Sequence, residues 1–453
     1  MASFFSFLKQ PEPAPEIQDG KKVSTMYRHW RMRIMYSMYM GYAFYYFTRK
    51  SFTFAVPTII EELGYTKTDM GIVATVFSLT YALSKFFSGV IVDQTNPRFV
   101  MSIGLLLTGV WNICFGMSSS LMFFVVFWGL NAVFQGCGAP PCARWLSHWY
   151  SQNERGRWWA IWNTSHNLGG FLIPYVVGFA AQYFGWRYAM YVPGVLCIIT
   201  GLFLLERLRD TPHSLGLPSI EKHRDDYPSE DHNKGQREHL SAKEIFREYI
   251  LPNRYIWLLA LSYFFVYVIR IAINDWGNVF LYEYKLSTIL NGSNAKFKAN
   301  AIVSFFEVGG FVGSLVAGWS SDYFFKGRRV PTAFFFVIMC VVSLWGLWMA
   351  PANSVFLNAL AFFFVGFFIF GPQMLTSMAT VEVSHKKAAG SAMGFASLFA
   401  YAGSAVAGYP MMLIADKYGW KGFFITLAIA GVICMMFQLP VWRAKSNPRF
   451  EKG

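Results

Sequence analysis

Long apolar stretches separated by short polar ones run through most of the chain. Each is about 20 residues long, which is the length that an α-helix needs to cross about 30 Å of hydrocarbon. The pattern predicts an all-α membrane protein with twelve transmembrane helices, arranged as two six-helix halves that repeat one another. The predicted spans lie near residues 34–59, 70–92, 99–117, 121–143, 158–183, 188–205, 255–281, 299–321, 331–350, 354–379, 389–414 and 422–442.

The polar stretches between the spans predict the domain organisation. Only one of them is long, and it separates the sixth span from the seventh. We therefore expect an N-terminal tail over 1–33, a first six-helix half over 34–206, a connecting loop over 207–254, a second half over 255–443 and a C-terminal tail over 444–453. The tails and the connecting loop are expected in the cytoplasm.

The distribution of lysine and arginine predicts the orientation in the membrane. With both termini inside, about 28 basic residues lie on the cytoplasmic side and about 7 on the other, as the positive-inside rule requires. Composition agrees with a membrane protein, because 55% of the residues are hydrophobic and only 14% are charged. The net charge of +14 thus reflects orientation rather than nucleic-acid binding. We expect a multi-pass protein of a bacterial inner (plasma) membrane.

The first and seventh spans share a sequence repeat. Residues 42–49 and 263–270 both follow the pattern Tyr-x-Phe-x-Tyr-x-x-Arg. A second repeat, Gly-x-x-x-Asp, follows the second and eighth spans, and we expect both copies to be conformational loops. Repeats of this kind place the substrate site of a transporter near mid-membrane, between two halves. The second repeat consists of Gly89, Asp93, Gly318 and Asp322.

Positively charged residues inside apolar spans are the feature of the sequence that indicates a binding site. Arg49 and Arg270 each lie about 15 residues into a span, or about 22 Å from its inner end. A charge at a helix centre costs about 2.5–3.5 kcal/mol, and snorkelling does not reach from that depth. Lys85 lies in the second span. Lys50 follows Arg49 and faces about 100° away, so it either binds or packs.

Few acids can balance these cations. Asp275 and Glu307 are the possible charge partners, so an anion is the natural complement of the site. The planar fork of arginine suits phosphate. A histidine side chain ordinarily titrates near neutral pH, as phosphate does, and His166 either donates to the ligand or bonds between helices. The hydroxyl groups of four tyrosines either bind the ligand or pack, namely Tyr42, Tyr46, Tyr81 and Tyr267.

The sequence gives no sign of an enzyme. It contains no phosphate-binding Walker loop, no cluster of histidine and cysteine for a metal and no nucleophile elbow. We therefore expect neither catalysis nor a cofactor, and no direct use of ATP.

Several motifs resemble a known family. The Gly-x-x-x-Asp repeats look like those of the major facilitator superfamily. Residues 41–52, 162–167, 371–375 and 386–390 are similar to the organophosphate:phosphate antiporters, and 267–276 to their hexose-phosphate branch. The resemblance covers the whole chain. It implies alternating-access exchange of a hexose phosphate, first of all glucose-6-phosphate, for inorganic phosphate. It also implies that Arg49 and Arg270 bind phosphate, with Lys85, His166 and the four tyrosines as secondary contacts.

One departure from the family keeps a second function open. The hexose-phosphate exchangers carry an aspartate and a lysine on the eleventh helix, and residues 399–408 here contain neither. Sensor proteins of the same branch also lack the pair, so the chain is either an exchanger or a sensor of external hexose phosphate that signals through a histidine kinase. A multidrug or cation exporter would need acids at mid-membrane. The expected partners are sugar phosphate, inorganic phosphate and the bilayer, with a monomer sufficient for exchange and a kinase only for a sensor.

Overall fold

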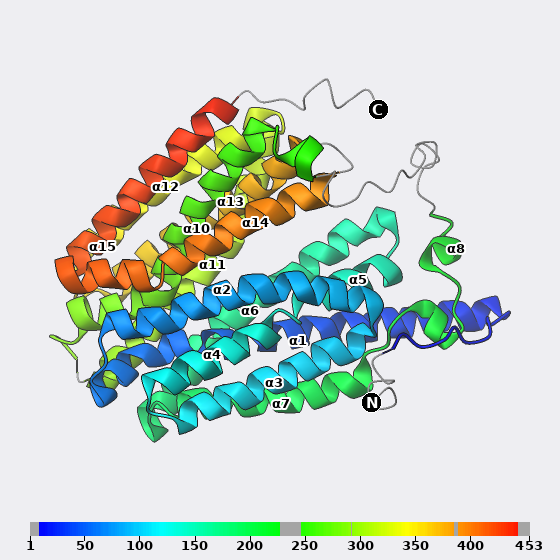
Figure 1. Cartoon of the computed structure of the whole chain (residues 1–453), viewed down its shortest axis with the longest axis horizontal. Coiled ribbons are helices and arrows are strands. Elements are labelled where there is room, and N and C mark those ends of the chain that lie inside the picture. The colour runs from blue at the N-terminus through cyan, green and yellow to red at the C-terminus, as the bar shows by residue number, and fades with distance from the viewer. Residues whose placement is uncertain (1–8, 227–245, 291, 385–387, 443–453) are drawn as a thin grey trace. The chain divides into compact units, whose positions relative to one another are not determined.

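The computed structural model describes residues 9–226, 246–290, 292–384 and 388–442, except for the side chains of Phe86, Asp93, Gln152 and Ala389. Within these ranges the regular elements are all helices (Figure 1). The first are α1 (Gly20–Leu63), α2 (Lys67–Gln94), α3 (Pro97–Met117), α4 (Leu121–Gln135), α5 (Ala139–Trp149), α6 (Gln152–Phe184), α7 (Tyr188–Arg207) and the short α8 (Ile220–Arg224). The later ones are α10 (Arg254–Phe280), α11 (Gly292–Phe325), α12 (Arg329–Met349), α13 (Val355–Glu382), α14 (Ala389–Val406) and α15 (Tyr409–Gln438).

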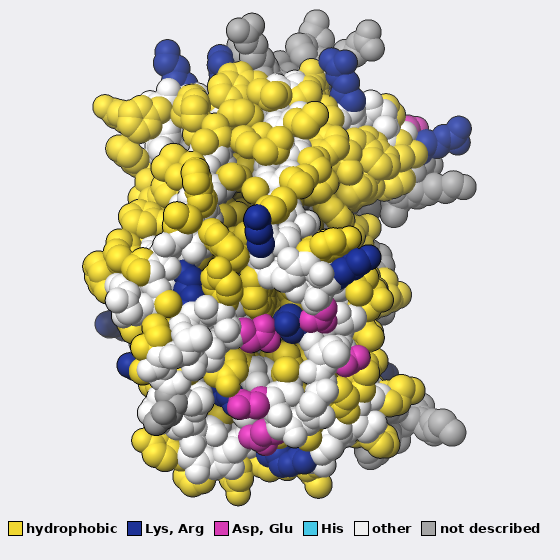
Figure 2. All heavy atoms as spheres, turned by 90° about the vertical axis from the view of Figure 1, so that its left-hand side faces the viewer, with side chains coloured by type: hydrophobic (Ala, Val, Ile, Leu, Met, Phe, Trp, Pro, Cys, Tyr) yellow, Lys and Arg dark blue, Asp and Glu magenta, His cyan; other side chains and the backbone are white. Residues whose placement is uncertain are grey.

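Nine ranges in the described residues are long and apolar enough to cross a membrane. One of them joins α4 to α5, and another contains both α14 and α15. α1 and α6 carry polar residues of the predicted site and are not among the nine. With these two included, the described helices cover every predicted span, although the fourth span divides into α4 and α5 and the eleventh extends from α14 into α15. Figure 2, which looks at the left-hand side of Figure 1, shows acidic and basic side chains among hydrophobic ones.

The helices group into two compact units. Unit 1 consists of Met1–Phe52, Thr80–Ala180 and Phe184–Lys234. Unit 2 consists of Thr53–Leu79, Ala181–Tyr183 and Gly235–Gly453. The end of α1 and the start of α2 therefore belong to unit 2, although both helices come from the first part of the chain.

Glycines allow close helix packing in unit 1. A Cβ atom on Gly109 of α3 would lie 2.6 Å from the carbonyl oxygen of Gly194 on α7. The fourth predicted span breaks into α4 and α5 around Gly136, where a Cβ atom would lie 2.7 Å from the carbonyl carbon of Ser84 on α2. Only glycine permits these approaches. The second one places the end of α4 against the part of α2 that carries Lys85.

Two buried asparagines tie the end of α1 into unit 2. Asn278 of α10 donates to the carbonyl oxygen of Thr53 over 2.8 Å, and Asn300 of α11 donates to that of Phe54 over 3.1 Å. Asn278 also donates to the side-chain oxygen of Asn300 over 3.1 Å. These bonds hold the α1 backbone to two other helices of the same unit.

Charged groups tie the start of α2 into the same unit. The Nζ of Lys67 lies 3.1 Å from Glu283 Oε2 and 3.3 Å from Asp416 Oδ1. The indole of Trp420 donates to Glu283 over 2.9 Å, and the backbone and hydroxyl of Thr68 both donate to Asp416. One cation thus holds two acids from separate segments of unit 2.

The first part of the expected connecting loop folds against unit 1. The indole of Trp149 donates to the carbonyl oxygen of Asp210 over 2.9 Å. The ring of Tyr27 on α1 stacks on the imidazole of His223 in α8, with 4.2 Å between centroids and 7° between planes. Residues 208–226 are therefore part of unit 1 rather than an independent loop.

Candidate functional site

Arg49 of α1 lies among aromatic rings in unit 1. Its Cζ is 4.5 Å from the centroids of both Tyr46 and Tyr81. Its Nη2 donates to the hydroxyl of Tyr81 over 3.1 Å, and its Nε donates to Gln135 Oε1 over 3.1 Å. Tyr46 precedes Arg49 by three residues, which puts both on one face of the helix. Cation–π attraction and hydrogen bonds therefore fix the guanidinium together.

Gln135 is a functional candidate that the sequence did not single out. It is fully buried at the end of α4, and its Nε2 donates to the carbonyl oxygen of Tyr45, to Thr48 Oγ1 and to Asn131 Oδ1. These three acceptors set the direction of the amide, so its oxygen points to Arg49. An amide inside an apolar span, next to a glycine, is the only signal that the sequence offered.

The other predicted residues of the first half gather around α1 and α6. The ring of Tyr42 lies 5.7 Å from that of Tyr46, and the ring of Tyr46 lies 5.6 Å from the imidazole of His166. Trp162, which was not predicted, lies 4.8 Å from Tyr42. The structure thus brings together the aromatic and imidazole groups of unit 1 that the sequence assigned to the ligand.

Lys50 and Lys85, the two lysines inside the predicted spans of unit 1, differ in position. Lys85 is half-buried on α2, four residues after Tyr81, so both lie on one face of that helix. Lys50 is buried in α1, with 8% of its surface exposed. Lys85 therefore lies on the same helix face as Tyr81, which contacts Arg49. Lys50, one residue after Arg49, lies on a different face of α1 from Arg49.

Arg270 of α10 lies in a corresponding aromatic setting in unit 2. Its Cζ is 4.5 Å from the ring centroid of Phe370 on α13 and 5.7 Å from that of Tyr267. Gln373 donates to the hydroxyl of Tyr267 over 3.5 Å, and the ring of Tyr401 lies 6.0 Å from that of Tyr267. Phe370 has no polar side-chain atom, so no pattern in the sequence singled it out.

The two predicted acids lie in unit 2. Glu307 of α11 is buried, and its Oε1 accepts a hydrogen bond from Asn274 over 3.1 Å. Asp275 of α10 accepts from the hydroxyl of Thr53 over 3.5 Å. Their role as charge partners of the cations stays a prediction.

The Gly-x-x-x-Asp repeats are helical, so the expectation of loops was wrong in this respect. Gly89 and Asp93 lie in the last turns of α2, and Gly318 and Asp322 in those of α11, because neither proline nor a helix cap interrupts these helices. Asp322 accepts from Arg329 Nη1 over 2.6 Å. Asp93 lies at a position whose side chain is outside the described part of the structure.

Each unit therefore presents one arginine held by a tyrosine three residues earlier and by a second ring from another helix. Each arginine is also linked to a carboxamide, directly through Gln135 in unit 1 and through Tyr267 to Gln373 in unit 2. Such fixed guanidiniums can offer parallel N–H donors to a tetrahedral oxyanion.

Comparison with known proteins agrees with the fold. The model of the Major Facilitator Superfamily matches residues 38–408. A bacterial homologue of the human lysosomal transporter Spinster, in an inward-facing and occupied conformation, has a TM-score of 0.71. The match covers 92% of this chain and 99% of that one, and at 14% identity it shows the fold alone.

Curated relatives extend over nearly the whole chain. A probable hexose phosphate transport protein of Chlamydia pneumoniae is 49% identical over 457 residues, 99% of each chain. The membrane sensor protein UhpC of Escherichia coli K12 is 47% identical over 97% of this chain and 98% of its own. The glycerol-3-phosphate transporter of Bacillus subtilis 168 is 36% identical over 95% and 97%. The chain therefore belongs to the Major Facilitator Superfamily and, as its motifs predicted, to the organophosphate:phosphate antiporter branch.

Proposed function

We propose that the chain is a secondary active transporter that exchanges a hexose phosphate, first of all glucose-6-phosphate, for inorganic phosphate by alternating access. The observation that carries the proposal is the pair of arginines, one in each unit, each held among aromatic rings on a helix that corresponds to a predicted membrane span. The name of the Chlamydia pneumoniae relative supports a hexose phosphate as the substrate.

Phosphate binding explains why two arginines would lie inside apolar spans despite the free-energy cost of a charge there. Arg49 and Arg270 would each supply two parallel donors to phosphate oxygens. Without an anion, occluding these cations leaves uncompensated charge in a medium of low polarity, at a cost of several kcal/mol. With a phosphate dianion bound, the charge is balanced and the site can close. Exchange, rather than free flux, follows from this difference.

The remaining predicted residues have secondary roles in the proposal. Lys85 and His166 would add donors to the phosphate and tune its protonation. Asp275 and Glu307 would limit the excess charge when the site is empty. The tyrosine hydroxyl groups would contact the sugar phosphate, with Tyr42, Tyr46 and Tyr81 in unit 1 and Tyr267 in unit 2. The proposal needs neither a cofactor nor a partner chain, and it includes an inner-membrane location with both termini in the cytoplasm.

Alternating access also needs contacts that can be made and broken on the outer side. In the proposed topology, Lys67, Glu283 and Asp416 lie at the outer ends of their helices. Their ion pairs are only partly exposed, with 19% of the Lys67 side chain accessible. They would hold the outer ends closed until the substrate arrives from outside.

The test uses purified protein in liposomes loaded with phosphate. We expect uptake of labelled glucose-6-phosphate only when phosphate is inside. Arg49→Lys and Arg270→Lys should each reduce exchange at least about 100-fold, since lysine keeps the charge but loses the fork. Arg157→Lys, a change at an exposed position, is the matched control. Uptake without internal phosphate would reject antiport, and full exchange in both lysine variants would reject the bidentate role.

The sensor function is the second candidate, and one observation favours it. The described part of α14, which includes residues 399–406, has no charged residue and so lacks the aspartate and lysine that the resemblance assigns to the exchangers. UhpC is also nearly as similar to the chain as the transport protein is. Saturable glucose-6-phosphate binding without exchange would support a sensor that signals through a histidine kinase.

A further inference from the structure

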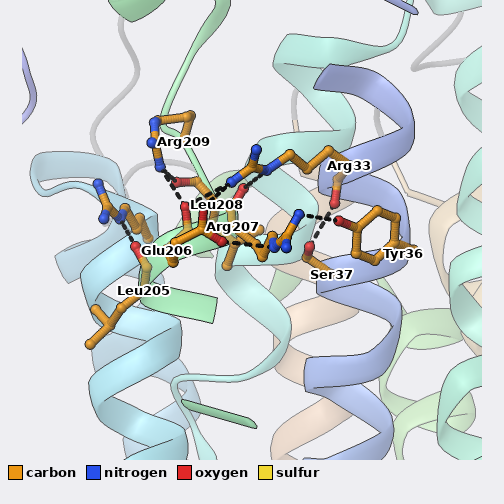
Figure 3. A network of polar contacts seen from close by, with 9 residues as sticks. Arg33, Tyr36, Ser37, Leu205, Glu206, Arg207, Leu208 and Arg209 are labelled. Carbon is orange, nitrogen blue, oxygen red and sulfur yellow. Dashed lines mark hydrogen bonds and ion pairs between the residues drawn. The ribbon is translucent and has the colours of Figure 1, made fainter. Parts of the chain in front are cut away.

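Arginines from three segments of unit 1 meet at the C-terminal end of α7. The last four carbonyl groups of a helix have no partner within it. Arg33 of α1 donates to the carbonyl oxygens of Glu206 and Arg207, each over 3.2 Å (Figure 3). Arg98, at the start of α3, donates to the carbonyl oxygen of Leu205.

Arg207 is itself the last residue of α7, and Arg209 is the fourth arginine at this helix end. Arg209 donates to the carbonyl oxygens of Glu206 over 2.8 Å and Leu208 over 2.7 Å. Capping explains why arginines are present, but it does not explain their number. We call this set the α7 arginine cluster, and it consists of Arg33, Arg98, Arg207 and Arg209.

The cluster carries more positive charge than the protein neutralises. Among the described residues, Glu206 is the only carboxylate in an ion pair with it, through Arg33 and Arg207. The Glu206 side chain is 62% exposed, so water screens its charge, whereas that of Arg33 is only 15% exposed. Burial, followed by the charge of Arg33, lowers the pKa of Arg209. Four cations against one exposed anion leave an excess of three charges.

An indole ring lies within the cluster. The Cζ atoms of Arg33 and Arg209 lie 4.7 Å and 5.1 Å from the ring of Trp30. Tryptophan beside arginine is typical of the level where a bilayer meets water. The positive-inside distribution assigns this end of α7 to the cytoplasmic leaflet, where anionic lipids are found.

From the cluster, α1 and α7 each continue with a line of apolar side chains along one helix face, which we call an apolar stripe. On α1, Tyr36 and Met40 follow Arg33 at the spacing of one helix face, and they are 39% and 41% exposed. On α7, Phe203 and Ile199 precede Arg207 at the same spacing, and Ile199 is 58% exposed. The Nη1 of Arg207 reaches the hydroxyl of Tyr36 over 3.3 Å, which joins the two stripes at their polar ends.

We propose that this face of α1 and α7 binds an anionic phospholipid, with head-group phosphate at the α7 arginine cluster and acyl chains along the two stripes. The polarity of the face changes from cationic to apolar over about 10 Å, two turns of helix, as a phospholipid changes from head group to chain. An excess of three charges favours a lipid with two phosphates, such as cardiolipin, over phosphatidylglycerol, and both over phosphatidylcholine. The inference does not depend on which substrate is transported.

The experiment measures lipid binding to the full-length protein in detergent by native mass spectrometry. We expect cardiolipin to bind more tightly than phosphatidylglycerol, and phosphatidylcholine to bind weakest. Each arginine lost should raise the Kd about fivefold, the factor that corresponds to about 1 kcal/mol per basic residue at an anionic surface. The double variant Arg33→Gln/Arg209→Gln should therefore bind cardiolipin about 25-fold more weakly.

Two control variants separate lipid binding from helix capping, and a competition with inorganic phosphate separates it from a free-phosphate site. Arg157→Gln removes an exposed arginine elsewhere in unit 1 and should leave the Kd unchanged. Arg33→Lys/Arg209→Lys keeps the charge, so its Kd should stay within about fivefold of the wild type. The proposal is overturned if the Gln double variant binds cardiolipin as the wild type does, or if the Lys variant loses as much affinity as the Gln variant. It is also overturned if inorganic phosphate displaces cardiolipin at equal concentration, which would identify a phosphate site.

Discussion

The guanidinium of Arg49 donates through Nε to the side-chain oxygen of Gln135, 3.1 Å away and on another helix of the same unit. Three acceptors bind the amide nitrogen of Gln135, and the amide is buried. Its oxygen is therefore held toward Arg49. Gln135 is thus a positioning residue for the arginine to which we assign phosphate binding.

Changing Gln135 to glutamate should weaken substrate binding more than transport turnover. A carboxylate at this position would pair with Arg49 and cancel the charge that attracts phosphate. We expect KM for phosphate exchange to rise at least about 10-fold in Gln135→Glu, with a smaller change in kcat. Exchange kinetics in liposomes measure both constants. An unchanged KM would show that Gln135 does not orient the arginine.

Changing Phe370 should affect the second arginine through its packing. The ring lies 4.5 Å from Arg270 Cζ, and a cation–π contact of this kind is worth about 1–2 kcal/mol when desolvated. We expect Phe370→Leu to raise KM about 5- to 30-fold, the factor that corresponds to about 1–2 kcal/mol, and Phe370→Tyr to stay near the wild type. Equal KM values in Phe370→Leu and Phe370→Tyr would mean that the ring only fills space.

Removing the charge of Lys67 should make the outer ends of the helices easier to separate. Lys67→Gln leaves Glu283 and Asp416 without their shared cation, and partly exposed pairs contribute about 0.2–1 kcal/mol each. We expect a membrane-impermeant thiol reagent to label a cysteine at the buried Ser78 position about 2- to 5-fold faster from outside. Lys421→Gln, at an exposed position of α15, serves as the control. A labelling rate that does not change would exclude this cluster from outer closure.

The contact between Tyr27 and His223 should make the docking of α8 depend on pH. Burial, and then the charges of Arg224 and Arg31, lower the pKa of His223 from its ordinary value of 6.5. A lowered pKa means that folding favours the neutral imidazole, so stability is complete above pH 6.5 and falls as the pH drops through that value toward the lowered one. Relative to its cleavage of an unstructured peptide at the same pH, trypsin should therefore cut after Lys222 faster at pH 5.5 than at pH 7.5. His223→Gln should remove the difference, and a difference that persists in this variant would contradict the assignment.

The sequence predicted more of the fold than of the site. Span length gave the twelve-helix membrane class, because bilayer thickness constrains every apolar stretch in the same way. The repeat around Arg49 and Arg270 predicted two similar settings, because a tyrosine three residues before an arginine shares its helix face whatever packs around it. Depth in an apolar span selected the two arginines, whose role in phosphate binding stays a prediction.

What the sequence left out depends on contacts between helices. Gln135 and Phe370 touch the arginines from α4 and α13, and no spacing within one helix reveals such a neighbour. The membership of residues 53–79 in unit 2 is likewise set by side chains such as Asn278 and Asn300, which are distant in sequence. The Gly-x-x-x-Asp repeats resembled loops because glycine and aspartate are common in turns, although the backbone there stays helical.

The aromatic rings around Arg49 also restrict the shape of the anion that it can bind. Two rings already cover its guanidinium, and one of them supplies a hydroxyl in contact with Nη2. A flat anion, such as an aromatic carboxylate, gains part of its affinity for arginine by stacking, and here it would compete with tyrosine for that surface. An oxyanion with tetrahedral geometry needs only the edge of the group, where N–H bonds lie in the plane. The same rings that stabilise this half-buried cation would therefore favour phosphate esters over flat anions.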